Sequence, residues 1–153
     1  KIKLASTYSN QYNAGGDGAL IDGLHGPNSY PTGFWQGFQG QDFEAVVDLG
    51  IIKQISNVSI GSIQEVKSWI WFPKDVEFFV SKDGENYTSI GFLNNDFSVN
   101  EYGSFIKDFE VVLDHPITTK YIKVKATNFG KCPEWHLGYG GDTWLFFDEI
   151  VIE

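Results

Sequence analysis

The stretch VEFFVSKDGENY, residues 76–87, is the clearest indication of the fold class. In its first half, apolar residues occupy every second position, which is the period of a strand that buries one face. The Asp83-Gly84 pair that follows supplies the positive φ that a tight hairpin turn requires. A second strand pattern then begins at Tyr87. The stretch therefore predicts two antiparallel strands joined by a hairpin.

The same alternation recurs on both sides of this hairpin, and helical periodicity is almost absent. A change of parity between Ile55 and Val58 predicts a β-bulge, and the last segment is apolar on both faces, as in a central strand. The expected strands are residues 2–5, 43–49, 54–62, 75–81, 87–93, 105–113, 119–127 and 144–152. About eight antiparallel strands predict an all-β jelly-roll β-sandwich that fills residues 1–153 as a single domain.

Three segments lack the strand pattern: Tyr8–Gln41, Gln64–Pro73 and Asn128–Asp142. In the first of them, the short run Ala19–Asp22 predicts one helical turn that ends before a glycine. Of the five tryptophans, four lie in these segments. We expect the three segments to gather at one rim of the sandwich.

Composition narrows the class of ligand. The 153 residues are 42% hydrophobic and 20% charged, and their formal net charge is −9. A chain so acidic is not expected to bind nucleic acid, and no apolar run reaches the roughly 18 residues of a spanning helix, so we expect no membrane insertion. All 11 bases are lysines, so the guanidinium fork that clamps anions is missing. We therefore expect a ligand that is neutral or cationic.

Tryptophans on loops have two interpretations. Such a ring either closes the end of the sandwich core or offers a flat platform to the C–H face of a sugar, whose hydroxyls then need amide, imidazole or carboxylate partners. Trp135 between Glu134 and His136 supplies both kinds of group, and Trp35 beside Gln36 does so again. Both interpretations remain open from the residues alone.

Other chemistry has weaker support. His136 follows the single cysteine, Cys132, by four residues, but a zinc site lacks further ligands at suitable spacing, and no base is identifiable for a cysteine nucleophile. Acidic residues such as Glu134 and Asp142 could form a glycosidase pair. Calcium fits better, because a glycine-rich loop with converging carbonyls plus a carboxylate such as Asp22 suits a hard cation; alternatively, Asp22 only caps a turn.

The order of these motifs resembles the discoidin, or coagulation-factor type C, domains. The resemblance rests on Ala19–Gly23, Phe34-Trp35, Val47–Gly50, Val58–Ile60, Val76–Gly84, Lys120–Val124 and Phe147–Ile150. Within that superfamily the chain is most similar to bacterial family 32 carbohydrate-binding modules, especially those at the C-termini of hexosaminidase (chitobiase)-like glycosidases. This second likeness lies in the loops Trp35–Phe38, Ser68–Pro73 and Cys132–His136.

The resemblance implies a galactose-binding-like jelly roll and a non-catalytic module that binds a terminal sugar of the galactose or N-acetylhexosamine class. It implies sugar contacts from Trp69, Trp135, His136, Glu134, Trp35 and Gln36, and a structural calcium ion held by Ala19, Asp22, Leu24, Thr32, Asp148 and Glu149. The module would target an attached glycoside hydrolase, such as a β-N-acetylhexosaminidase, to its glycan in a secreted, periplasmic or cell-surface setting.

Two alternatives belong to other classes. The chain could be a structural or protein-docking sandwich of a larger glycosidase, with no sugar site. It could also be a small hydrolase that uses Glu134 and Asp142.

Overall fold

The computed structural model describes residues 1–153 and contains seven strands and three short 3₁₀ turns. The strands are β1 (Ile2–Leu4), β2 (Gln36–Gln39), β3 (Phe43–Gln64), β4 (Asp75–Ser81), β5 (Thr88–Asn94), β6 (Phe105–Ala126) and β7 (Trp144–Ile152). The turns are η1 (Asn10–Tyr12), η2 (Ala19–Ile21) and η3 (Val66–Ser68). All strand pairings are antiparallel, in the order β2-β7-β3-β6-β4-β5, with β1 beside β3.

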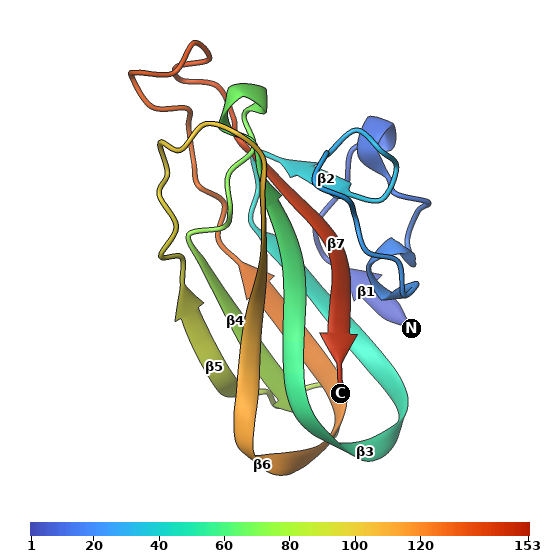
Figure 1. The fold of residues 1–153 in the computed structure, drawn as a ribbon. Coiled ribbons are helices and arrows are strands. Elements are labelled where there is room, and N and C mark those ends of the chain that lie inside the picture. Colours follow the sequence, from blue (N-terminus) through green and yellow to red (C-terminus); the bar gives the residue numbers. More distant parts are fainter.

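Strands β3 and β6 build both layers of the sandwich. Each is 22 residues long, and they stay paired from Phe43 opposite Ala126 to Gln64 opposite Phe105. Their paired segments 43–48 and 121–126 form one layer with β1, β4 and β5, and their other halves form the second layer with β7 and β2. Figure 1 shows both strands bending at the end of the molecule nearest the C-terminus.

The predicted all-β antiparallel fold is confirmed, but the count of eight strands is wrong. The predicted pairs 43–49 with 54–62 and 105–113 with 119–127 are each a single strand that bends without leaving the sheet. Register shifts between Asp48 and Lys53 and between Ile55 and Asn57 accommodate the bend, and the second of them is the predicted bulge. The 81–86 hairpin and the central position of β7 are also confirmed.

Strand β2 was missed because it is short and lies inside the predicted irregular segment. It pairs with β7, and Gly37 faces Phe146 so closely that a Cβ there would lie 2.8 Å from Cζ of the ring. A glycine is therefore needed for this approach, which breaks the alternating pattern that identifies a strand.

The core fills the space between the layers. Its main cluster holds 20 buried residues, among them Phe38, Phe43, Phe78, Phe109 and Phe147. Burial of this apolar surface is the main stabilising term, since the only cysteine is free. No helix has the length and apolarity that a bilayer span requires.

The loops divide between the end and the side of the sandwich. Figure 1 places η3, the loop between β5 and β6 and the loop between β6 and β7 together at the end opposite the strand bends. Most of the N-terminal segment instead lies along β2 and β7. The expectation that all three irregular segments share one rim is therefore met by two of them, and only the end of the first reaches the rim.

Candidate functional site

The loop between β6 and β7 has a tightly bonded neck. Lys131 and Asp142 form an ion pair and an isolated bridge, and Cys132 exchanges backbone hydrogen bonds with Gly141 and Gly140 at 2.9 and 3.0 Å. The residues between these ends are thus held as a closed loop.

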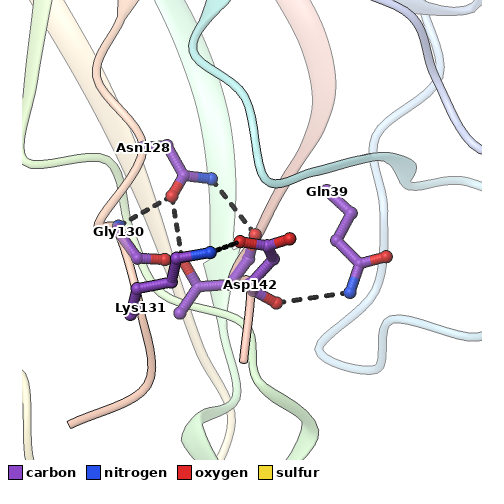
Figure 2. A network of polar contacts seen from close by, with 6 residues as sticks. Gln39, Asn128, Gly130, Lys131 and Asp142 are labelled. Carbon is purple, nitrogen blue, oxygen red and sulfur yellow. Dashed lines mark hydrogen bonds and ion pairs between the residues drawn. The ribbon is translucent and has the colours of Figure 1, made fainter. Parts of the chain in front are cut away.

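A polar network anchors this neck to the sheet (Figure 2). The Asn128 side chain accepts from the Gly130 amide at 2.7 Å and from the Thr143 hydroxyl at 2.9 Å, and its Nδ2 donates to the Thr143 carbonyl at 3.2 Å. Gln39 at the end of β2 donates to the Asp142 carbonyl at 3.3 Å. Because buried polar groups are fully paired here, the loop starts from a fixed position.

His136 fixes the tip of the loop from inside. It is buried, its Nε2 lies 2.6 Å from the Val66 carbonyl, and its Nδ1 accepts from the Gly138 amide at 2.9 Å. The Gly138 contact assigns the proton to Nε2, which donates to Val66 and so ties the loop to η3. Both ring nitrogens are hydrogen-bonded within the chain, so His136 holds the loop in place.

Trp135 is the exposed aromatic ring of the loop. Its side chain is 48% exposed and stands edge-on to Trp71 and Tyr102, with ring centroids 6.4 and 6.2 Å away. Leu137 and Tyr139 are exposed on the same loop. We call Tyr102, Trp135 and Tyr139 the aromatic rim.

Trp69 braces the rim. Its backbone is left-handed, with φ of 68°, as the C-cap of η3, and its carbonyl accepts from the Trp144 amide at 2.8 Å. The half-buried ring lies against Gly138 and Gly141, where an added Cβ would come within 2.4 and 2.5 Å of ring carbons. Trp69 therefore packs mainly against the loop that carries Trp135.

Trp71 is the buried aromatic ring next to Trp135. It stacks on Phe129 with centroids 4.7 Å apart, and donates from Nε1 to the Val99 carbonyl at 2.7 Å. Its ring therefore connects the loops on both sides of the rim.

The other predicted sugar contacts are not brought to this surface. Trp35 and Gln36 are 1% and 0% exposed. Trp35 donates to the Pro27 carbonyl at 2.9 Å, and Gln36 donates to the carbonyls of Asn13 and Gly16. Both side chains close the core beneath the N-terminal segment. For Trp35 this is the first of the two interpretations of a loop tryptophan, a ring that closes the end of the core. The candidate site therefore does not include Trp35 or Gln36.

The acids of the loop differ in their availability. Glu134 is exposed beside Trp135, whereas the Asp142 carboxylate is engaged by Lys131. Neither of the other rim residues was predicted as a sugar contact: Tyr139 lies within the predicted irregular segment Asn128–Asp142, whereas Tyr102 was missed altogether. It lies in the loop between β5 and β6, outside the three irregular segments, and no motif marks it.

A second cluster joins the N-terminal segment to β7. Asp22 follows η2, and its Oδ1 accepts from the Leu24 amide at 2.9 Å. Glu149 lies on β7, and its Oε2 accepts from the Gly23 amide at 2.9 Å. The two carboxylates predicted to hold calcium are thus neighbours.

Burial and like charge act together on the carboxylates of this cluster. Oε1 of Glu149 is buried and has no hydrogen-bond partner. Burial raises the pKa of Glu149 to about 7; the Asp22 carboxylate adds to the rise and the Gly23 amide opposes it. A buried oxygen that lacks a donor is stabilised by a cation, so these residues fit the predicted ion. No group of three or more His, Cys, Asp or Glu side chains forms a metal cluster, so most further ligands would be backbone oxygens.

The other predicted calcium ligands differ in burial and in hydrogen bonding. Asp148 accepts from the amides of Gly26 and Glu149 at 2.9 and 2.7 Å, and burial raises its pKa. Ala19 is buried in η2. Thr32 is exposed and its hydroxyl donates to the Ser29 carbonyl at 3.2 Å.

Comparison with known proteins gives one family and one fold. The F5/8 type C domain family matches residues 3–141 of the chain. No curated protein matches the chain. Solved structures match over nearly its whole length at low identity.

Three of these structures are carbohydrate-binding modules. The family 32 module of Clostridium perfringens NanJ, in complex with galactose, is 18% identical, with a TM-score of 0.59 over 100% of this chain and 93% of that one. Chitosan-binding module 1 of a chitosanase/glucanase from Paenibacillus sp. IK-5 is 16% identical, with a TM-score of 0.59 and coverage of 100% and 93%. The module CpGH89CBM32-5 of Clostridium perfringens, in complex with GalNAc-β-1,3-galactose, is 16% identical, with a TM-score of 0.55 and coverage of 99% and 93%. These likenesses support the galactose-binding-like jelly roll.

Proposed function

The chain belongs to the F5/8 type C domain family, and from this premise we propose that it is a non-catalytic carbohydrate-binding module whose aromatic rim holds a terminal sugar. The observation that carries the proposal is the half-exposed Trp135 ring on a loop held at its neck and from inside. A rigid exposed ring costs little entropy to use as a platform.

The chemistry around Trp135 suits a neutral pyranose. The ring offers a flat surface to a C–H face, worth about 0.5–1.5 kcal/mol by analogy with aromatic pairs. The Tyr102 ring lies against Trp135, and Glu134 and Tyr139 are exposed on the same loop as Trp135, so their polar groups can meet sugar hydroxyls. The similar modules named above bind galactose, GalNAc-β-1,3-galactose and chitosan, which supports the galactose or N-acetylhexosamine class.

The expected affinity is low. A shallow site with one platform and a few hydroxyl contacts gives about −4 to −6 kcal/mol, or roughly 0.05 to 1 mM. Useful retention then comes from tethering to a catalytic domain or from several modules on one chain. We therefore propose that the module keeps an attached glycosidase of the hexosaminidase type near its glycan, in a secreted, periplasmic or cell-surface setting.

A titration of galactose, N-acetylgalactosamine, N-acetylglucosamine and glucose tests the proposal. Binding is followed by saturation-transfer NMR and by tryptophan fluorescence. We expect one of the sugars to bind, Trp135→Ala to abolish the signal and Trp135→Phe to retain part of it. Phe92→Ala, which removes an exposed ring on β5, is the matched control and should bind as the wild type does. Silence of the folded wild type across the panel contradicts the proposal.

We also propose that Asp22 and Glu149 hold a structural calcium ion, with backbone oxygens near η2. The support is the unpartnered Glu149 Oε1 beside a second carboxylate. Bound there, the ion supplies positive charge that holds the N-terminal segment against β7, where the chain has no disulfide.

A second candidate function is docking to a protein surface. The observation that favours it is Leu137, which is fully exposed on the loop beside the rim and offers a sugar neither a flat ring nor a polar group. Leu137→Ser separates the two functions, because it should leave monosaccharide binding unchanged and weaken association with a catalytic domain.

A further inference from the structure

A depression in the surface lies away from the aromatic rim. It has a volume of about 690 Å³ and lies over the outer face of the layer formed by β1, β3, β6 and β4. Its floor is formed by outward-facing residues of β3 and β6, one wall by β1, and the other wall by the turn between β4 and β5. We call it the sheet groove.

The turn that forms its second wall is rigid. The Asp83 carboxylate accepts from the amides of Glu85 and Asn86, both at 2.8 Å, and from Asn86 Nδ2 at 2.7 Å. Gly84 lies over the Tyr121 ring, because a Cβ there would be 3.3 Å from ring carbons. The turn therefore packs on Tyr121 at the floor of the groove, and its hydrogen bonds fix the position of this wall.

Strand register places two lysines in one row across the floor. Lys3 of β1 pairs with Val46 of β3, and Val46 pairs with Lys123 of β6. Neighbouring strands are about 4.8 Å apart, so the two lysine backbones lie about 10 Å apart with a small apolar side chain between them. The Lys123 ammonium lies 4.1 Å from the centre of the Tyr87 ring, which lines the same groove.

The basic groups of this groove lack acidic partners, whereas most of its acids are engaged. Neither Lys3 nor Lys123 has a carboxylate within ion-pair distance, since the four ion pairs of the chain involve other residues. Glu44 is paired with Lys125 at 3.6 Å, and Asp48 accepts from the Gly50 amide at 2.8 Å.

The charges divide the groove into two sides. Lys1, Lys3 and Lys123 have no ion-pair partner, and the only unpaired acid on the strands of the floor is Asp48. The turn carries the carboxylates of Asp83 and Glu85, and hydrogen bonds from neutral amides leave the negative charge of Asp83 in place. Charges beyond about 8 Å are largely screened at physiological salt, so this local arrangement matters more to a ligand than the net charge of −9.

The backbone of the floor is not free to bind a peptide strand. Residues 43–48 of β3 pair with both β1 and β6, and residues 121–126 of β6 pair with both β3 and β4. A ligand must therefore be recognised by side chains alone, through two ammonium groups, two phenols and a shallow apolar floor. A chain of hydroxylated rings bearing carboxylates matches that set.

We propose that the sheet groove is a second binding site, which takes an acidic oligosaccharide through Lys3, Lys123, Tyr87 and Tyr121. Two lysines whose backbones lie about 10 Å apart on neighbouring strands suit carboxylates on different sugar units, so the ligand is an oligomer. This site is independent of the neutral terminal sugar at the aromatic rim.

Amide-resolved NMR titration with tetragalacturonate tests the proposal. The neutral β-1,4-galactotetraose and a tetraglutamate peptide serve as comparison ligands. We expect tetragalacturonate to shift the amides of residues 3–5, 44–48, 84–87 and 121–123, and to bind more weakly as sodium chloride rises from about 50 to about 250 mM.

Variants separate this site from the rim. Lys123→Gln and Lys3→Gln should each weaken tetragalacturonate binding about fivefold, Lys123→Arg should restore most of it, and Lys53→Gln, outside the groove, should have no effect. Trp135→Ala should leave the groove intact while removing the rim site.

Three results overturn the proposal: no shifts in the groove at millimolar ligand, equal binding of the neutral tetramer, or equal binding of the glutamate peptide, which would assign the groove to acidic chains in general.

Discussion

Replacing Gly138 with alanine tests the packing that positions the aromatic rim. An added Cβ would lie 2.4 Å from Cε2 and 2.5 Å from Cζ2 of Trp69. The backbone of Gly138 is not left-handed, so alanine meets no conformational strain and the collision is the only obstacle. If Trp69 braces the loop that carries Trp135, this single methyl group must displace one of the two.

The size of the effect follows from these distances. Carbon atoms in contact are normally about 3.5–4.0 Å apart, so ring and loop must separate by about 1 Å. Overpacking of this kind costs about 1–3 kcal/mol, and the reduced freedom of the unfolded chain returns about 0.4–1 kcal/mol. The net loss therefore lies between about 0 and 2.6 kcal/mol, and a loss of about 1–2 kcal/mol, near the middle of this range, should lower the melting temperature by roughly 2–8 °C for a domain of this size.

A double-mutant cycle followed by calorimetry gives the assay. Gly138→Ala is measured alone and in a Trp69→Ala background, where the methyl group has room and should cost close to nothing. Gly18→Ala is the control, because its Cβ would have no atom within 4 Å and its φ is not left-handed. The reasoning is refuted if Gly138→Ala melts at or above the wild type, or if its cost persists without the Trp69 ring.

Three further predictions follow from the same structure. A calcium chelator should lower the melting temperature of the wild type but not of Asp22→Ala or Glu149→Ala, because an ion bound only to the folded state stabilises it by mass action; equal melting with and without chelator contradicts this. Asn128→Ala should cost about 1–3 kcal/mol in urea unfolding, because the Thr143 carbonyl and its neighbours lose their partner; an unchanged midpoint would show that water replaces the amide. Hydrogen bonds from the amide of Asn86 and the other turn groups lower the pKa of Asp83 in the folded state. The contribution of Asp83 to folding stability is therefore complete above its unfolded pKa of about 4 and is lost as the pH falls toward its folded pKa. Asp83→Asn should flatten this acidic part of the curve of stability against pH, and curves of the same shape for variant and wild type would exclude the effect.

The layers of this fold were predictable because alternation reports which face of a strand is buried. The hairpin at Asp83-Gly84, the bulge near Ile55 and the central β7 all follow from short-range patterns. The number of strands does not follow from such patterns. Strands β3 and β6 keep their backbone pairing through a bend, but their alternating apolar pattern is interrupted there. Gly37 hides β2 for a related reason, since its close approach to Phe146 removes a side chain from the pattern.

The candidate site was less predictable because exposure depends on contacts between distant segments. Trp35 and Trp135 are the same residue type on loops of similar composition, yet their exposures are 1% and 48%. The difference arises because the N-terminal segment covers Trp35 near Pro27, whereas nothing covers Trp135. His136 likewise becomes structural only once η3 brings the Val66 carbonyl to its ring.

The charges available to a ligand also depend on contacts between distant segments, because ion pairing determines which charged side chains remain free. The net charge of −9 led to the expectation of a neutral or cationic ligand, and the residues of the rim agree with it. In the sheet groove, however, register pairs Glu44 with Lys125 and leaves Lys3 and Lys123 flanking Val46. A one-residue slip of β1 would turn Lys3 to the other face of the sheet. The position of the unpaired lysines on this face is therefore a property of the strand register, and composition alone does not contain it.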